Sequence, residues 1–331
     1  MLNKTTHQFA FHDIPLECDV YDADDYPNTR PVFLFFHSGG LVGGARICLP
    51  PWLAQVCFER QWPLISASYR LLPQSGGQGL LKDALAAHAF AQSWKAEDNG
   101  KKRSVIAGGA SAGFFMANLL AHHAKTLPVA LLGITGIPTF RHPFFNSSTL
   151  LTPEPIDDQD MAPYIDNPVE VGSTSQADKT VFFLDRILPS GRQNADFVQP
   201  VVKPVIPLPD SKWYRGCLYD YFLHRNKFLD LVGDVDAGFE WTKSNPDKLA
   251  AWPPTVFIQG DKDYDVSVDV TLYVVNCLGI EKATLWLANN QGHLFEATSF
   301  IEDQGQGMDA VQKAIASLDA FLSPEVARLD S

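Results

Sequence analysis

Short apolar runs that alternate with helical patterns constrain the fold of this chain more than any other feature of its sequence. The apolar runs occupy residues 31–36, 63–69, 104–107 and 129–134. Segments with helical character separate or follow them at residues 50–60, 80–95 and 112–125. A continuous apolar run is typical of a strand buried on both faces of a parallel sheet. The alternation therefore predicts an α/β fold, in which helices cover both faces of a mainly parallel central sheet.

The pattern changes after the fourth apolar run. Residues 136–254 are rich in proline and aromatic side chains and contain few recognisable strands. Apolar runs resume at 255–259 and 283–287, and a final helical pattern follows them. A long irregular insertion between two strands of one sheet is usually a functional cover rather than a linker. We therefore expect residues 1–135 and 255–331 to form the core and the insertion to form a lid or cap.

Composition narrows the classes of partner and the compartment. The chain carries 26 Lys and Arg residues against 38 Asp and Glu residues, a formal net charge of −12 without a basic stripe. Such a surface repels phosphate backbones, so nucleic acid is not an expected partner. The first twenty residues lack the uninterrupted apolar stretch of a signal peptide, and no segment approaches a membrane span. Five scattered cysteines are typical of reduced thiols, so we expect a cytoplasmic protein; no CxxC pair indicates a metal, and no cofactor is expected.

A Gly-Ala-Ser-Ala-Gly segment at residues 109–113 follows a predicted strand and precedes a predicted helix. In this context a GxSxG motif places its serine on a sharp strand-to-helix turn. A serine hydroxyl is a weak nucleophile, so it has to be exposed where a general base can reach it. The motif also fits a plain small-residue turn in a βα unit. Its context nevertheless predicts that Ser111 is a nucleophile, with Gly109 and Gly113 allowing strand and helix to approach closely.

A second glycine-rich segment, His-Ser-Gly-Gly at residues 37–40, stands at the end of the first apolar run. Acyl transfer builds negative charge on a carbonyl oxygen, and removing one of the N–H donors that stabilise it typically costs about 3 kcal/mol. Glycine lets the backbone come close to a substrate. We therefore predict an oxyanion hole formed by the amides of Gly39, Gly40 and Ala112, with His37 as a brace of the loop. The alternative is an ordinary glycine-rich turn.

Two further loops supply a candidate general base and its acidic partner. Of nine histidines, only His293 follows a late strand in a Gly-His turn, and Asp261, Asp263 and Asp265 follow the strand predicted at 255–259. A histidine serves as base for a serine when a carboxylate orients its ring. The order serine, acid, histidine along the chain is one that such sites use. We predict a catalytic triad of Ser111, Asp263 and His293, with the other two aspartates as alternatives for the acid.

Together these motifs resemble the hormone-sensitive-lipase-like branch of the α/β-hydrolase superfamily. The matching segments are residues 37–40 for its HGGG motif, 69–73 (Tyr-Arg-Leu-Leu-Pro) for YRLAP, 109–113 for GDSAG, and the later segments 260–263 and 292–293. Ser38 replaces the first glycine of HGGG, Ala110 replaces the acidic residue before the nucleophile, and Gln74 stands where many members have Glu. Because few residues precede His37, the N-terminal cap helices of many relatives are expected to be missing.

The resemblance implies an α/β-hydrolase fold and a serine esterase, that is, a carboxylic-ester hydrolase. The ester would be cleaved through an acyl-enzyme. The missing N-terminal cap and the large aromatic insertion suggest that the substrate is a small, largely apolar ester of specialised metabolism. A non-hydrolytic enzyme of the same fold (a lyase, dehydratase or cyclase) would use the same pocket, because one fold hosts many reactions. A binding module that has lost its catalytic histidine is a third reading, against which the presence of His293 argues. The aromatic side chains of residues 136–254 form either a wall around an apolar substrate or the packing of the lid.

Overall fold

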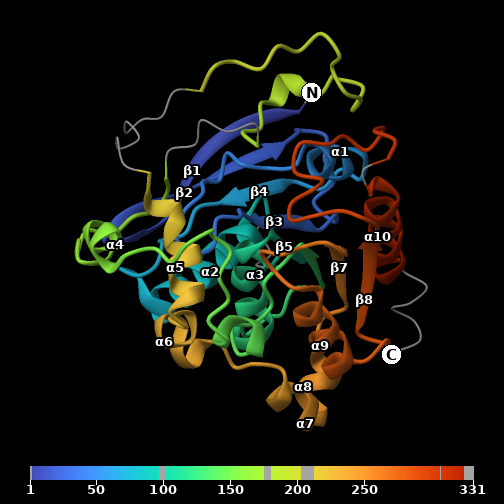
Figure 1. The fold of residues 1–331 in the computed structure, drawn as a ribbon. Coiled ribbons are helices and arrows are strands. Elements are labelled where there is room, and N and C mark those ends of the chain that lie inside the picture. Colours follow the sequence, from blue (N-terminus) through green and yellow to red (C-terminus); the bar gives the residue numbers. More distant parts are fainter. Residues whose placement is uncertain (1, 97–100, 175–179, 203–211, 306, 324–331) are drawn as a thin grey trace.

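One eight-stranded sheet forms the centre of the protein (Figure 1). The computed structural model describes residues 2–96, 101–174, 180–202, 212–305 and 307–323. The strands are β1 (Asn3–His12), β2 (Ile14–Asp22), β3 (Val32–Phe36), β4 (Leu64–Ala67), β5 (Val105–Ala110), β6 (Ala130–Ile134), β7 (Thr255–Gly260) and β8 (Ala283–Ala288). Their order in the sheet is β1-β2-β4-β3-β5-β6-β7-β8. Strands β3 to β8 run parallel, and β2 is antiparallel to β1 and β4, so the mainly parallel sheet predicted from the sequence is confirmed.

Helices cover both faces of this sheet (Figure 1). Helices α1 (Pro51–Glu59) and α10 (Met308–Leu322) pack on one face, and α2 (Gly76–Ser93), α3 (Ala112–His123) and α9 (Val268–Leu278) pack on the other. The side chains of β3 divide between the two cores in the alternation that a strand requires. Leu34 and Phe36 lie in the cluster under α2 and α3, whereas Phe33 and Phe35 lie in the cluster under α1. Burial on both faces explains why this strand is a continuous apolar run.

The N-terminal hairpin of β1 and β2 was not anticipated from the sequence. Strand β1 is largely exposed, and its polar residues interrupt any apolar run, so it lacks the signal that marks the inner strands. It is the edge strand of the sheet and pairs only with β2, through a register shift between Gln8 and Ala10. The described residues before β3 contain no helix.

The described residues between β6 and β7 form short helices joined by irregular segments. The α-helices are α4 (Asp158–Ile165), α5 (Leu218–His224), α6 (Phe228–Val232), α7 (Glu240–Ser244) and α8 (Pro246–Ala251), with 3-10 turns η1 (Pro143–Asn146), η2 (Leu184–Arg186), η3 (Arg215–Cys217) and η4 (Gly233–Val235). Phe140, Phe145 and Phe228 are fully buried in the cluster that also contains α2 and α3. Their rings contact one another, with Phe140 stacked on Phe228 at 4.6 Å between centroids. These aromatic side chains therefore pack the segment onto the core.

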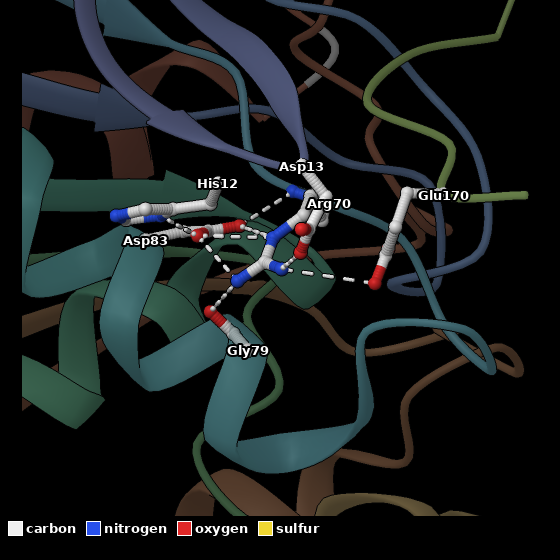
Figure 2. A network of polar contacts seen from close by, with 6 residues as sticks. All are labelled: His12, Asp13, Arg70, Gly79, Asp83 and Glu170. Carbon is white, nitrogen blue, oxygen red and sulfur yellow. Dashed lines mark hydrogen bonds and ion pairs between the residues drawn. The ribbon is translucent and has the colours of Figure 1, made fainter.

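A buried ionic network ties the N-terminal hairpin to the loop that follows β4 (Figure 2). The carboxylate of Asp83, on α2, accepts hydrogen bonds from the amide, Nε and Nη2 of Arg70 at 2.9–3.2 Å. It also lies 2.6 Å from Nδ1 of His12, at the end of β1. Glu170, from the segment between β6 and β7, lies 3.7 Å from Arg70 Nη1. The network fixes three parts of the chain around Arg70.

Among the helices that the structure describes, none has both the length and the apolar character needed to cross a lipid bilayer.

Candidate active site

Ser111 lies in the sharp turn between β5 and α3. Its backbone has φ 52° and ψ −125°, a conformation that residues other than glycine rarely adopt and that costs on the order of 1–3 kcal/mol. Its amide donates to the carbonyl of Ile134 on β6 (2.8 Å), which holds the turn. A β-carbon on Gly113 would lie 2.1 Å from the carbonyl oxygen of Phe36, and one on Gly109 would lie 2.1 Å from the backbone of Gly113. Glycine at both positions is therefore needed for the helix to approach the sheet.

His293 lies between Ser111 and Asp263. Its Nε2 is 2.9 Å from the hydroxyl oxygen of Ser111, and its Nδ1 is 2.8 Å from Oδ2 of Asp263. The three side chains come from the loops after β5, β7 and β8, at the carboxyl ends of parallel strands, where open α/β sheets place their ligand sites. The structure thus brings together the three residues that were singled out from the sequence.

Asp263 is held in place by its own hydrogen bonds. Its Oδ1 accepts from the amides of Asp265 (3.1 Å) and Val266 (2.9 Å), while its Oδ2 accepts from Nε2 of Gln259 (2.7 Å). The Gln259 amide is itself fixed, because it also donates to the carbonyl of Val266 and accepts from the hydroxyl of Thr271. The side chain of Asp263 is fully buried, so the hydrogen bonds compensate for the burial of its carboxylate.

The two other candidate aspartates lie differently. The amide of Asp261 bonds to the carbonyl of Ala288 at 3.1 Å, and its Oδ1 is buried without a partner among the described residues. Asp265 offers its backbone carbonyl to the hydroxyl of Tyr219 and contributes a charge that acts on His293. Of the three, Asp263 is the one that the structure places in hydrogen-bond contact with His293.

Electrostatics at His293 favour a proton on the ring. Burial alone lowers the pKa of His293, but the hydrogen bond and charge of Asp263, together with the charges of Asp265 and Glu296, raise the pKa above its ordinary value. A histidine that acts as a general base becomes an imidazolium when it accepts a proton. The surroundings of His293 therefore stabilise the form that this reaction would produce.

The glycine-rich loop after β3 forms a tight turn beside this group. The carbonyl of Gly39 accepts from the amides of Val42 (3.0 Å) and Gly43 (2.9 Å), and both Gly39 and Gly40 have positive φ, at 123° and 63°. The amides of Gly39, Gly40 and Ala112 have no acceptor among the described residues, and Ala112 is the first residue of α3. Unsatisfied N–H groups at a glycine-rich turn and at a helix N-terminus are suited to binding an anion.

His37 does not reach the Ser111 hydroxyl and instead braces the loop. Its Nδ1 lies 2.7 Å from the carbonyl oxygen of Ser38, and its ring stacks on Tyr69 at 4.3 Å between centroids. Tyr69 in turn donates its hydroxyl hydrogen to the carbonyl of His37 at 2.9 Å. Burial lowers the pKa of His37 to about 4, so its ring is neutral at neutral pH.

Two residues of η3 and α5 connect the segment between β6 and β7 to the loops of this site. Tyr219 donates its hydroxyl hydrogen to the carbonyl of Asp265 at 2.6 Å, and its ring lies against Gly40. Arg215 donates from Nε to the carbonyl of Val42 (2.9 Å) and from Nη2 to that of Leu72 (2.7 Å). Tyr219 therefore contacts two of the loops that surround Ser111, the one after β3 and the one after β7.

Ligand atoms of Asp263, Asp265 and His293 lie within 4.8 Å of one another, so this cluster offers enough donors for a cation. Both ring nitrogens of His293 and both carboxylate oxygens of Asp263 already take part in the hydrogen bonds described above. A metal ion would have to replace these contacts, so the arrangement fits proton transfer better than metal binding. The expectation that the protein uses no metal or cofactor stays a prediction.

Sequence reasoning did not assign three residues that the structure places around this site. Gln259 is a polar residue near the end of the apolar strand β7, where a buried amide is unusual. This feature of the sequence could have identified it. Glu296 is a charged residue among apolar neighbours just after the Gly-His turn, and this feature could have identified it in the same way. Tyr219 was one of many aromatic residues in the insertion, and nothing in the sequence distinguished it from those that pack the core.

Comparisons with known proteins identify the family of this chain. The family described as alpha/beta hydrolase fold matches residues 33–206. Lipase 2 of Moraxella sp. (strain TA144) is 32% identical over 122 residues, which are 36% of this chain and 28% of that lipase. The match therefore spans well under two thirds of the length of this relative.

Solved structures share the fold at low sequence identity. An alpha/beta hydrolase superfamily protein from Enterococcus faecalis superposes with a TM-score of 0.63 at 17% identity, covering 97% of this chain and 98% of the other. A hyperthermophilic esterase from the archaeon Pyrobaculum calidifontis gives a TM-score of 0.56 at 18% identity, covering 97% of this chain and 86% of the other. The resemblance inferred from the motifs is thus confirmed at the level of family and fold.

Proposed function

The chain belongs to the alpha/beta hydrolase fold family, whose relatives here include a lipase and esterases, and on this basis we propose that it is a serine esterase that cleaves a carboxylic ester. The single observation that carries the proposal is the continuous chain of contacts from Asp263 through His293 to Ser111, at 2.8 and 2.9 Å. A serine, a histidine and a carboxylate in this geometry can activate a hydroxyl as a nucleophile.

The proposed reaction has two steps. In the first, Nε2 of His293 takes the proton of Ser111 while the Ser111 oxygen attacks the ester carbonyl. The same proton then passes to the departing alcohol. In the second, His293 removes a proton from water, and the water oxygen attacks the acyl group on Ser111. The bond between the acyl carbon and the Ser111 oxygen then breaks, the proton on His293 passes to that oxygen, and a carboxylic acid is released. Asp263 accepts the Nδ1 hydrogen of His293 throughout, which fixes the ring and stabilises its protonated form.

The negative charge on the carbonyl oxygen needs donors in both steps. We assign this role to the amides of Gly39, Gly40 and Ala112, because they have no acceptor among the described residues. Ala112 follows Ser111 directly, and the loop of Gly39 and Gly40 begins at Phe36 and His37, whose carbonyls lie against Gly113. Fixed donors of this kind stabilise a tetrahedral intermediate without having to reorganise.

We also propose that residues 136–254 act as the lid of this site and that residues 1–135 and 255–331 form its core. The contacts of Arg215 and Tyr219 with the loops after β3, β4 and β7 support this division. The ring of Tyr219 against Gly40 favours a small, largely apolar ester as substrate. A cytoplasmic location is part of the proposal and rests on the odd number of scattered cysteines.

The proposal is tested by replacing the nucleophile. We expect S111A to lose hydrolysis of p-nitrophenyl acetate by at least roughly 1,000-fold, and we expect a fluorophosphonate probe to label the parent protein but not the variant. S93A, which changes an exposed serine near the end of α2, is the matched control and should retain both properties. Hydrolysis that survives in S111A would refute the nucleophile. A folded parent protein that neither hydrolyses esters nor takes the label would favour a non-hydrolytic reaction instead.

A further inference from the structure

Glu296 carries a buried carboxyl group that the proposed reaction does not use. Its side chain is fully buried, and neither of its carboxylate oxygens has a hydrogen-bond partner among the described residues. Burying an ionised carboxylate without a partner is costly, and most buried polar groups in proteins are satisfied. Packing alone does not explain a buried carboxyl group without a hydrogen-bond partner. The location of Glu296 near His293 suggests a role for it.

Glu296 is three residues beyond His293, in the turn between β8 and α10. The neighbouring side chains of Leu294 and Phe295 pack against the apolar cluster that contains Ala110, the residue before the nucleophile. The turn is held by its own backbone, because the carbonyl of Glu296 accepts from the amide of Ser299 at 3.0 Å. The carboxyl group of Glu296 is thus fixed in the protein interior, in the same loop as His293.

The ionisable groups that act on Glu296 come from two loops. His293 lies in its own turn, and Asp263 lies in the loop after β7. Burial raises the pKa of Glu296 to about 7, an effect that its own backbone amide and the positive form of His293 oppose and the charge of Asp263 reinforces. The charge of Glu296 also acts on His293, alongside those of Asp263 and Asp265. His293 and Glu296 therefore form an interacting pair, in which the charge of each group affects the titration of the other.

We propose that Glu296 is a second acidic partner of His293, which stabilises the protonated ring from within the protein interior while Asp263 orients it by direct hydrogen bonding. Glu296 touches neither Ser111 nor a substrate in this proposal, so it is a positioning residue that acts through His293. The inference rests on the proposed function for its catalytic consequence, but the electrostatic coupling itself does not require an ester substrate.

The coupling has a definite direction. When Glu296 loses its proton, its negative charge increases the proton affinity of His293. Replacing it by the neutral, similarly shaped glutamine removes that charge and lowers the pKa of His293. Because the acid limb of kcat/KM reports the pKa of an essential base, E296Q should move this limb to lower pH by about one unit, the lower end of the effect of a nearby charge. At alkaline pH the loss of the charge should reduce kcat several-fold and leave KM unchanged.

The primary experiment is an NMR titration of the His293 ring in the ¹⁵N-histidine-labelled full chain, with H293N used to assign its signals. We expect two inflections in the parent protein, one from each member of the pair, and a single inflection at lower pH in E296Q. E296D, which keeps a carboxyl group, should retain a higher His293 pKa than E296Q. The matched control is E302Q, the same change six residues further along, where the carboxylate is bonded to Gln55 and the amide of Gln193.

Equal His293 pKa values in the parent protein, E296Q and E302Q would overturn the inference, whatever the esterase activity. A lowered pKa in E296Q accompanied by an unshifted acid limb would also overturn it, because the charge would then have no catalytic role. If E296Q does not fold, the NMR titration of the parent protein still tests the inference, because a single inflection for His293 would contradict the coupling. Lack of ester hydrolysis by the parent protein would refute the proposed function separately, and the NMR titration would still decide on the pair.

Discussion

The ring of Tyr219 lies directly against the α-carbon of Gly40. A β-carbon on this glycine would be 2.6 Å from Cδ2 of the tyrosine, so no other residue fits there while Tyr219 keeps its position. The same side chain bonds through its hydroxyl to the carbonyl of Asp265, two residues beyond Asp263. One residue of α5 thus restricts the space in front of the glycine-rich loop and links it to the loop that carries the proposed acid.

Tyr219 is therefore expected to limit the size of the substrate. We expect Y219A to raise the ratio of kcat/KM for p-nitrophenyl octanoate to that for p-nitrophenyl acetate by roughly tenfold, because each buried methylene contributes about 0.8 kcal/mol when space is available. Y219F keeps the ring and removes one hydrogen bond, worth about 1 kcal/mol, so its chain-length ratio should stay close to that of the parent protein. An unchanged ratio in Y219A would show that the ring does not border the acyl site.

The three aspartates after β7 should differ sharply in their effect on activity. We expect D263N to lower kcat by about 10,000-fold, since the amide cannot hold the required tautomer of His293. D261N and D265N should lose far less, because neither carboxylate is in hydrogen-bond contact with His293. Steady-state kinetics with p-nitrophenyl acetate measures all three, and a loss in D261N as large as that in D263N would reassign the acid.

The pH dependence should have its acid limb above the ordinary histidine range. Hydrolysis requires neutral His293, and the net effect of its surroundings raises the pKa of His293 above the ordinary histidine value of 6.5. Activity is thus expected to fall as the pH decreases through a midpoint above 6.5. His37 does not contribute to this limb, because its pKa lies at about 4. A kcat/KM profile in buffers of constant ionic strength, with far-UV circular dichroism to check folding, would contradict the assignment if the midpoint fell below 6.

The network around Asp83 should contribute to stability rather than to chemistry. Its carboxylate is fully buried and bonded to Arg70 and His12, so D83N leaves Arg70 without its main partner. Breaking a buried pair in this way typically costs about 3–5 kcal/mol, which urea unfolding would measure. D309N removes an exposed carboxylate that faces Lys313 at 3.4 Å and should cost less than about 0.5 kcal/mol. Equal losses in the two variants would show that the network does not stabilise the fold.

The sequence predicted those parts of the structure that depend on residues close to one another along the chain. Strands β3 to β7 are buried on both faces, and the glycines at 109 and 113 are required by contacts that a β-carbon would prevent. Strand β1 escaped prediction because an exposed edge strand carries polar residues, and its pairing with β2 depends on the rest of the sheet.

Residues whose surroundings come from distant parts of the chain could not be recognised in advance. Tyr219 is significant only because α5 sets it between Gly40 and Asp265, and neither neighbour is near it in sequence. Asp83 is buried by the approach of His12 and Arg70 from β1 and from the loop after β4. Such contacts depend on tertiary packing, which propensity and motif spacing do not specify.

The strand order also has a consequence for how the protein is made. Strand β6 receives its second neighbour only when β7 has left the ribosome, and residues 135–254 separate the two. At roughly 5–20 residues per second, that interval lasts on the order of 6–24 s. During this time β6, whose residues are all buried in the finished sheet, has an open apolar edge of the kind that promotes aggregation. The nascent chain is therefore expected to need a chaperone most during synthesis of the segment between these two strands.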